Sequence, residues 1–499
     1  MMDVIKNQFL IKTEDVKMAK SKNAILETGI YDAKQLGIPK MLVLGFQHMF
    51  AMFGATVLVP LLTGLDVATT LLMAGLGTLL FHVITKMKVP AFLGSSFAFL
   101  GGYAAVAPAA GSGEMTQKEL LPYACLGVAA AGLVYLVLAT IIKLVGVKKV
   151  MKFFPPVVTG PIIIAIGLGL SASAVNNCAA NWPLALIALA IVIIFNIWGK
   201  GMAKIIPILL GVVGAYIVAV LVGNVGGVEG WAIDFTSVKE AAWIGIPIHK
   251  EATILGVNWS NKSLIISSII GIMPIALATM MEHIGDISAI SATVGKNYIK
   301  DPGLHRTLTG DGFATAIASL FGAPANTTYG ENTGVLALSK VYDPKVIRLA
   351  AIFAVVLSFS PKFSAIISTI PTAIIGGISF MLYGMISAIG VRNVVESKVD
   401  FTKSRNLIIA AVILVCTFGI KYSSAMGCDT VAGIDGSVSF SIGGIAISLS
   451  ALAVASIAGI VLNAVLPGKD YEFTEDEPKD TGVNFAAGQN TTRLEKEDK

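Results

Sequence analysis

The chain has 499 residues, of which 55% are hydrophobic and only 13% are charged, and its mean hydropathy is +0.79. A water-soluble domain has about a quarter of its residues charged, so the composition excludes a soluble protein and is typical of many apolar segments of about 20 residues in a bilayer. The net charge of +5 does not indicate nucleic-acid binding, because lysine and arginine lie mostly in tails and loops. The four cysteines lack metal-ligand spacing, and we expect no metal or cofactor.

The first 38 residues are polar and lysine-rich without a secretory signal, and a charged tail follows residue 466, so we expect two cytoplasmic tails. With this orientation the inside loops hold 18 Lys and Arg and the outside loops hold 6, as expected from the positive charge of cytoplasmic loops. Between the tails the sequence predicts fourteen membrane segments. Their apolar runs are 40–63, 68–85, 91–109, 121–145, 153–174, 182–198, 203–222, 263–290, 307–321, 326–339, 346–360, 364–389, 406–420 and 438–465.

An internal repeat relates the fifth run to the twelfth. Pro155 and Gly160 recur as Pro371 and Gly376, 216 residues later, and a Ser-Ala pair recurs at the same offset. The two runs are seven segments apart, and an odd number places the two copies in opposite directions across the membrane. The repeat therefore indicates the inverted topology that is common in secondary transporters.

The third and tenth runs, which are equivalent under the same shift, are both interrupted by small residues, at 94–96 and at 322–328. Paired interruptions of this kind indicate a binding site near the middle of the membrane. Non-helical backbone persists at that depth only where it lines protein or a cavity, and its free polar groups suit a small planar molecule with amide-like edges. Simple helix kinks at Gly and Pro are the alternative.

Glu282, Asp286 and Glu331 lie in apolar runs, where ionisable side chains are costly and usually functional. Glu282 and Asp286 are four residues apart and share a helix face, and two poorly solvated carboxylates so close cannot both ionise cheaply. Glu331 follows the second interruption, where it could accept hydrogen bonds from ring N–H groups. The pattern predicts a proton-coupled carrier. The alternatives are a solvated charge at the helix end for Asp286 and a purely structural role for Glu331.

Aromatic and neutral polar residues near the interruptions are weaker candidates. Phe97 and Phe99 could stack on a flat ring or simply pack in the interior. For Gln47 and His48 we favour polar contacts between helices over a place in the site.

These motifs resemble those of the nucleobase–ascorbate transporters, also called the nucleobase:cation symporter-2 family, and within it the bacterial uracil permeases. The resemblance covers about residues 38–465 and includes the signature Glu331-Asn332-Thr333-Gly334 followed by Ser339-Lys340. The other matching stretches are 47–60, 94–99, 282–285, 301–306 and 326–334.

The resemblance implies an all-α polytopic membrane protein with fourteen transmembrane segments in a 7+7 inverted repeat, and short antiparallel β-strands in segments 3 and 10. It also implies a core domain and a gate domain. The expected divisions are an N-terminal tail at 1–38, core at 39–147, gate at 148–225, an extracellular loop at 226–262, core at 263–362, gate at 363–466 and a C-terminal tail at 467–499.

Carried over residue by residue, the resemblance implies a nucleobase site and a proton path. The substrate-binding residues would be Glu282, Glu331, Phe97, Gly330, Tyr329 and Ala55, and the proton-coupling residues Glu282, Asp286 and Glu331. Phe97 and Gly330 would offer backbone amides, Tyr329 would flank the base and Ala55 would line the pocket. Related uracil permeases carry His where Asp286 stands, so the coupling route could differ here.

The expected function is a multi-pass plasma-membrane symporter that imports uracil with protons, and the resemblance allows a homodimer through the gate domain. The alternatives are the same mechanism with xanthine, another purine or thymine, and an anion transporter of the same 7+7 architecture. An enzyme is not expected, because the sequence has no H-E-x-x-H, G-x-S-x-G, P-loop or dinucleotide-binding motif.

Overall fold

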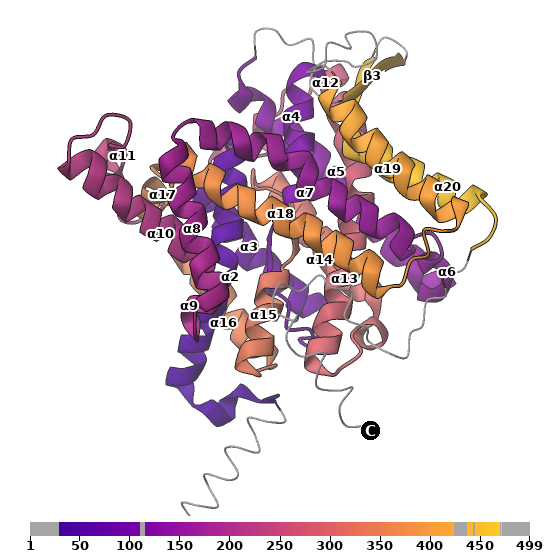
Figure 1. Ribbon diagram of the computed structural model, residues 1–499, viewed down its shortest axis with the longest axis horizontal. Coiled ribbons are helices and arrows are strands. Elements are labelled where there is room, and N and C mark those ends of the chain that lie inside the picture. The colour runs from indigo at the N-terminus through magenta and orange to yellow at the C-terminus, as the bar shows by residue number, and fades with distance from the viewer. Residues whose placement is uncertain (1–28, 110–114, 424–436, 443–444, 470, 472–499) are drawn as a thin grey trace, which may run out of the picture.

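The computed structural model describes residues 29–109, 115–423, 437–442, 445–469 and 471, and these are mostly helical (Figure 1). Within this part of the chain, eight helices are long and apolar enough to cross a membrane, or nine if α16 (Pro344–Ser358) and α17 (Pro361–Ser368), which meet at 88°, form one span. The chain is therefore a multi-pass membrane protein. The count of fourteen segments stays a prediction, since several of the expected runs form helices that are too short to span alone.

Helix boundaries in the first half follow local signals in the sequence. The Asp66 carboxylate accepts a hydrogen bond from the Thr69 amide at 2.6 Å and caps α3, and Thr116 and Glu119 form a reciprocal capping box before α5. The elements are α2 (Ile38–Thr63), α3 (Val67–Ile84), β1 (Leu93–Ser95), α4 (Leu100–Ala109), α5 (Gln117–Val145), α6 (Val147–Met151), α7 (Pro156–Ala179), α8 (Trp182–Trp198), α9 (Met202–Ile205), α10 (Pro207–Ala219) and α11 (Thr236–Glu240).

The second half continues with another strand between helices. Its elements are α12 (Lys262–Ile272), α13 (Ala276–Val294), α14 (Leu304–Leu320), β2 (Asn326–Thr328), α15 (Gly330–Ser339), α16, α17, α18 (Thr372–Glu396), α19 (Ser404–Tyr422), β3 (Ser437–Ile442), β4 (Ile445–Ser450) and α20 (Ala451–Val465). As in the first half, the short strand β2 is followed directly by a short helix.

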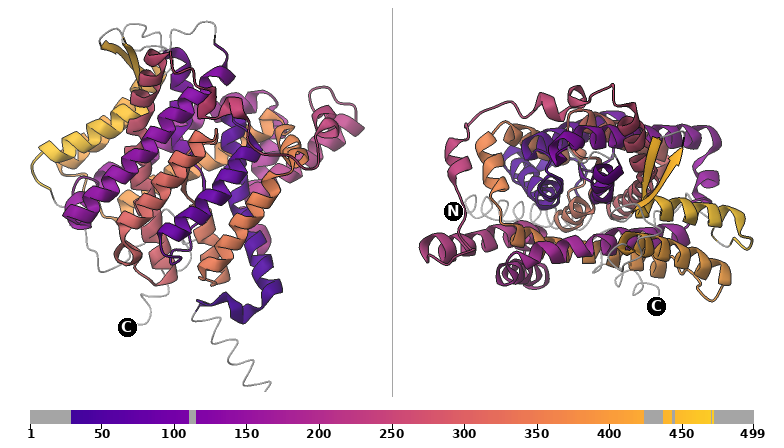
Figure 2. Two further views of the ribbon diagram at one scale, coloured as in Figure 1. Left: turned by 180° about the vertical axis from the view of Figure 1, so that it is seen from behind. Right: turned by 90° about the horizontal axis from the view of Figure 1, so that it is seen from above.

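Seen from above, the helices form two layers (Figure 2). In one layer α14 packs against α3 and α5, and α16 packs against α2 and α3. In the other layer α18 packs against α7 and α8, and α19 packs against α7 and α20. The division into core and gate stays a prediction, and two of its expected boundaries, after 147 and after 362, fall inside α6 and α17.

Helices α7 and α18, which carry the internal repeat, are antiparallel and touch along their backbones. Gly160 and the start of α7 lie beside Gly390 near the end of α18, whereas Gly376 near the start of α18 lies beside Cys178. The Ser387 hydroxyl also donates to the Ile164 carbonyl at 3.1 Å. The two helices begin 216 residues apart, after Pro155 and Pro371, and their antiparallel packing agrees with the opposite directions predicted for the two copies.

The prediction of an all-α protein is wrong in the last apolar run. Residues 438–465 contain the antiparallel strands β3 and β4 followed by the 15-residue helix α20. Serine alternates with apolar residues through 437–442 and again through 447–450, and this period of two favours a strand over a helix. The apolar run 364–389, predicted as one segment, is divided between two helices in the structure, because α17 ends at Ser368 and α18 begins at Thr372.

Candidate functional site

Two short strands from distant parts of the chain meet inside the bundle. β1 and β2 pair antiparallel, with Leu93 opposite Thr328 and Ser95 opposite Asn326, and all residues of both strands are buried. Gly94 lies in the middle of β1, where a Cβ would stand 2.5 Å from the Tyr329 ring and 2.6 Å from the Thr56 hydroxyl. Glycine at this position therefore lets α2 and Tyr329 approach the strand.

The non-helical backbone around the strands is satisfied by neighbouring groups, as the membrane interior requires. The Ser96 amide donates to the Ala325 carbonyl at 2.9 Å, and the Tyr329 amide donates to the Phe92 carbonyl at 3.0 Å. The Thr78 hydroxyl of α3 accepts from the Leu93 amide at 2.9 Å. These bonds hold the two strands in one position relative to α3.

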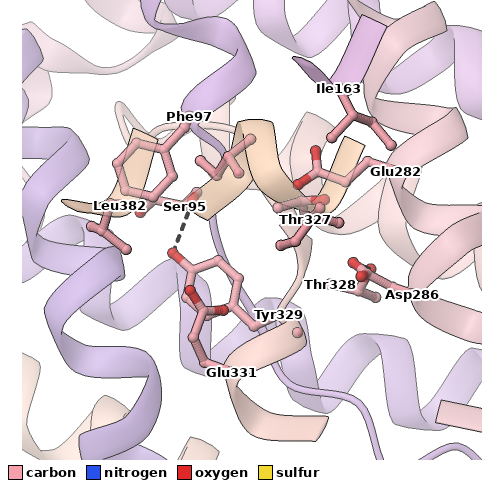
Figure 3. A pocket seen from close by; sticks show the side chains of 13 residues that line it. Ser95, Phe97, Ile163, Glu282, Asp286, Thr327, Thr328, Tyr329, Glu331 and Leu382 are labelled. Atoms are coloured by element: carbon pink, nitrogen blue, oxygen red, sulfur yellow. Dashed lines mark hydrogen bonds between the residues drawn. The ribbon is translucent and has the colours of Figure 1, made fainter. Parts of the chain in front are cut away.

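A cavity opens beside the strands, and the empty space in it and at its mouth, open solvent included, is about 570 Å³. Figure 3 shows the carboxylates of Glu282 and Asp286 on one side and Phe97 and Leu382 on the other. Helices α7 and α18 supply only apolar residues to it, and the rest of the lining comes from β1, β2, α13, α15 and the segments beside the strands. The lining residues are Ser95, Phe97, Ile163, Glu282, Asp286, Thr327, Thr328, Tyr329, Gly330, Glu331, Leu382, Ile386 and Ile389.

The three predicted carboxylates all reach this cavity. Asp286 is 2% exposed, and its Oδ2 accepts a hydrogen bond from the Thr328 hydroxyl at 2.6 Å. Its Oδ1 has no hydrogen-bond partner within the described part of the chain. Glu282, one turn earlier on α13, and Glu331, in the first turn of α15, are only half-buried and line the cavity. Asp286 is therefore a buried residue of the site and not a solvated charge at the end of α13.

The aromatic residues of the site are held by specific contacts. The Tyr329 hydroxyl donates to the Ser95 carbonyl at 2.8 Å and lies 3.3 Å from the Thr56 hydroxyl, so this residue, directly after β2, is connected to both β1 and α2. The Phe97 ring meets the Tyr383 ring of α18 edge to face, with 6.0 Å between the centroids. Phe97 therefore lies where the layer of the strands meets the layer of α18.

Five of the six residues predicted to bind substrate line the cavity, and Ala55 does not. Ala55 is 1% exposed inside α2, whose contact with the site is made by its neighbour Thr56. His48 lies behind the site, where its carbonyl accepts a hydrogen bond from the Asn332 side-chain amide at 2.9 Å. This contact between α2 and α15 matches the interhelical role favoured for His48.

Several residues of the site and its surroundings were not predicted. The apolar wall of α7 and α18, Tyr383 and Thr327 were missed, although the internal repeat had already singled out both helices. A buried pair of side chains, His283 and Asp311, was not predicted either. The Nδ1 atom of His283 lies 2.8 Å from Oδ2 of Asp311, although the angle is not that of a hydrogen bond. Both side chains are fully buried. His283 stands next to Glu282 in the sequence, which was the available signal.

Comparison with known proteins identifies relatives along most of the chain. The model of a family described as Permease family matches residues 39–426. A uracil permease of Bacillus caldolyticus is 42% identical over 448 residues, which are 87% of this chain and 93% of that protein. A uracil permease of Bacillus subtilis strain 168 is 39% identical, over 84% of this chain and 91% of that protein. A uracil permease of Escherichia coli strain K12 is 36% identical, over 80% of this chain and 90% of that protein.

Solved structures with low sequence identity share the fold alone. The transmembrane domain of the cyanobacterium bicarbonate transporter BicA matches with a TM-score of 0.55 at 14% identity, over 80% of this chain and 99% of that one. SLC26A9 matches with a TM-score of 0.59 at 14% identity, over 92% of this chain and 70% of that one. The chain is a transporter and not an enzyme, and it belongs to the nucleobase–ascorbate transporter family.

Proposed function

We propose that the chain imports uracil together with protons across the plasma membrane, and that uracil binds in the cavity beside β1 and β2. The observation that carries the proposal is the gathering of Glu282, Asp286 and Glu331 from two helices at one cavity next to an aromatic ring. The names of relatives that are 36–42% identical over most of the chain support uracil as the substrate.

The lining of the cavity suits the edges and faces of a small planar lactam. Carboxylates accept hydrogen bonds and would take the ring N–H groups of the base. The Gly330 amide, the first of α15, has no carbonyl partner within its helix and could donate to a carbonyl oxygen. Phe97 offers a ring face or edge, and the apolar side chains of α7 and α18 would cover the base from the other layer.

Proton coupling is assigned to the same carboxylates. Asp286 is tied to β2 through Thr328, so a change in its protonation would act directly on a strand that lines the cavity. The proposed movement is a rocking of the core against the gate, within fourteen segments whose termini both face the cytoplasm. A homodimer through the gate domain completes this proposal.

Two other classes of substrate can be compared with the cavity, namely anions and other nucleobases. An anion is disfavoured, because three carboxylates and no lysine or arginine line the cavity. Thymine or a purine such as xanthine would use the same acceptors, so these bases are the competitors that the experiment must include.

The test is uptake of labelled uracil into liposomes that contain the purified protein, driven by an inward proton gradient. Uracil should accumulate, a protonophore should abolish the accumulation, and unlabelled xanthine should compete poorly. Glu282→Gln, which changes one carboxylate of the cavity to an amide, serves as the matched inactive variant. Uptake that ignores the gradient would contradict proton coupling, and inhibition mainly by xanthine would move the substrate to a purine.

A further inference from the structure

Thr327 stands out among the polar residues of the cavity because its hydroxyl is buried and unused. The residue is the middle one of β2, is 3% exposed and lines the cavity. Its Oγ1 has no hydrogen-bond partner among the residues that the structure describes. Buried hydroxyls are nearly always hydrogen-bonded, and leaving one unpaired is costly, so an unpaired hydroxyl beside a cavity can gain from bonding to a bound molecule.

The side chains of the two residues that flank Thr327 in the strand already form hydrogen bonds within the protein. The Asn326 side-chain amide donates to the Met73 carbonyl at 3.2 Å and lies 3.4 Å from the Ala314 carbonyl. The Thr328 hydroxyl donates to Asp286 at 2.6 Å. Asn326 and Thr328 therefore fix the strand to α3, α14 and α13, and Thr327 is left to face the cavity.

The other hydroxyl groups in the lining also donate hydrogen bonds within the protein. Besides Thr327, the lining residues with a hydroxyl group are Ser95, Thr328 and Tyr329. The Ser95 hydroxyl donates to the Thr56 carbonyl at 3.0 Å, and the Tyr329 hydroxyl donates to the Ser95 carbonyl at 2.8 Å. Within the lining, Thr327 is thus the one hydroxyl whose proton is not already donated to another group of the described structure.

The position of Thr327 complements the carboxylates. Figure 3 shows its side chain on the same side of the cavity as Glu282 and Asp286, across from Phe97 and Leu382. A lactam edge alternates N–H and C=O groups, so a carboxylate that accepts from an N–H leaves an adjacent carbonyl oxygen in need of a donor. An ionised carboxylate cannot donate, whereas a threonine hydroxyl can.

We propose that Thr327 is a specificity-determining residue, whose hydroxyl donates a hydrogen bond to the ring carbonyl oxygen next to the N–H that a carboxylate of α13 accepts. The inference rests on the proposed import of a nucleobase and adds the residue that recognises its carbonyl. A base with a poor acceptor at that position, such as a thiocarbonyl, would lose this contact.

The experiment measures binding of uracil, 2-thiouracil and 4-thiouracil to the purified full-length protein by calorimetry. In the wild type, one of the two thio analogues should bind more weakly than uracil. Thr327→Val, which keeps the shape and removes the hydroxyl, should weaken uracil roughly 10-fold to 100-fold and should erase the preference against that analogue. Thr327→Ser, which keeps the hydroxyl, should retain the preference.

A matched control is Thr315→Val in α14, the same substitution at a fully buried threonine whose hydroxyl donates to the Asn326 carbonyl at 2.8 Å, away from the cavity. It should keep the wild-type ratio of affinities even if it lowers stability. If Thr327→Val does not fold, Thr327→Cys, a weak donor of similar size, should show the same loss of preference.

The outcomes separate the two proposals. A wild type that binds uracil while Thr327→Val keeps the wild-type preference, or loses affinity equally for all three bases, overturns the role of Thr327 alone. A wild type that binds none of uracil, 2-thiouracil and 4-thiouracil overturns the proposed function and this inference with it.

Discussion

The backbone contact between α7 and α18 can be tested by adding one methyl group. A Cβ at Gly167 would lie 2.3 Å from the Tyr383 carbonyl oxygen and 2.3 Å from the Ser387 hydroxyl. The carbonyl is part of a helix and cannot rotate away, so α7 and α18 would have to separate by about 1 Å to restore ordinary contact. Overpacking of this kind costs about 1–3 kcal/mol, which exceeds the roughly 0.5–1 kcal/mol that alanine gains over glycine within a helix. Gly167→Ala should therefore lower the melting temperature in detergent.

Gly169→Ala is the matched control, because it changes the same helix two residues further on. A Cβ there would meet nothing closer than 3.8 Å, the distance to a methyl group of Thr417. This variant should melt at the wild-type temperature or slightly above it. Equal melting temperatures for the two variants would refute the reasoning, since both gain the same helix propensity and differ only in the contact with α18.

Three further changes test the site and its surroundings. Glu331→Gln should lose uracil uptake or shift preference toward purines in competition assays, and unchanged uracil kinetics would contradict the proposed contact. Asp286→Asn keeps an acceptor for the Thr328 hydroxyl but cannot exchange a proton, so uptake should lose part of its dependence on pH; an identical pH profile would leave Asp286 with a structural role. Asp311→Ala leaves His283 without its partner at 2.8 Å, and breaking a buried pair costs about 3–5 kcal/mol. Melting should drop, and adding His283→Phe should restore part of the loss.

The carboxylates of the site could be predicted because their chemistry conflicts with their surroundings. An acidic residue within an apolar run is costly, and this argument found Glu282, Asp286 and Glu331 without any knowledge of the fold. The interruptions at 94–96 and 322–328 were visible for a similar reason, since clusters of Gly, Ser, Thr, Asn and Pro disfavour a continuous helix. Their pairing as β1 and β2 required knowing that segments more than 200 residues apart meet.

What the sequence could not predict depends on contacts between distant segments. Thr327 and Thr328 are adjacent and chemically identical, yet the Thr328 hydroxyl is bonded to Asp286 and the Thr327 hydroxyl has no partner in the described structure. Only the register and the position of α13 distinguish them. Similarly, Ala55 lies next to Thr56 on α2, and a small rotation of that helix decides which of them contacts Tyr329. The hairpin of β3 and β4 was missed because its residues are as apolar on average as a membrane helix, and only their alternation differs.

The chemistry of the two walls of the cavity bears on how the layers could move. Every residue that α7 and α18 contribute to the lining is apolar, namely Ile163, Leu382, Ile386 and Ile389. On the opposite wall the hydroxyls of Ser95 and Thr328 donate within their own layer, to the Thr56 carbonyl and to Asp286. An apolar wall can slide across such a surface without breaking hydrogen bonds, and the glycine contacts between α7 and α18 would make these two helices move together. Separating them, as Gly167→Ala should do, is therefore expected to slow transport more than it weakens uracil binding, because the polar groups proposed to bind the base belong to the other layer.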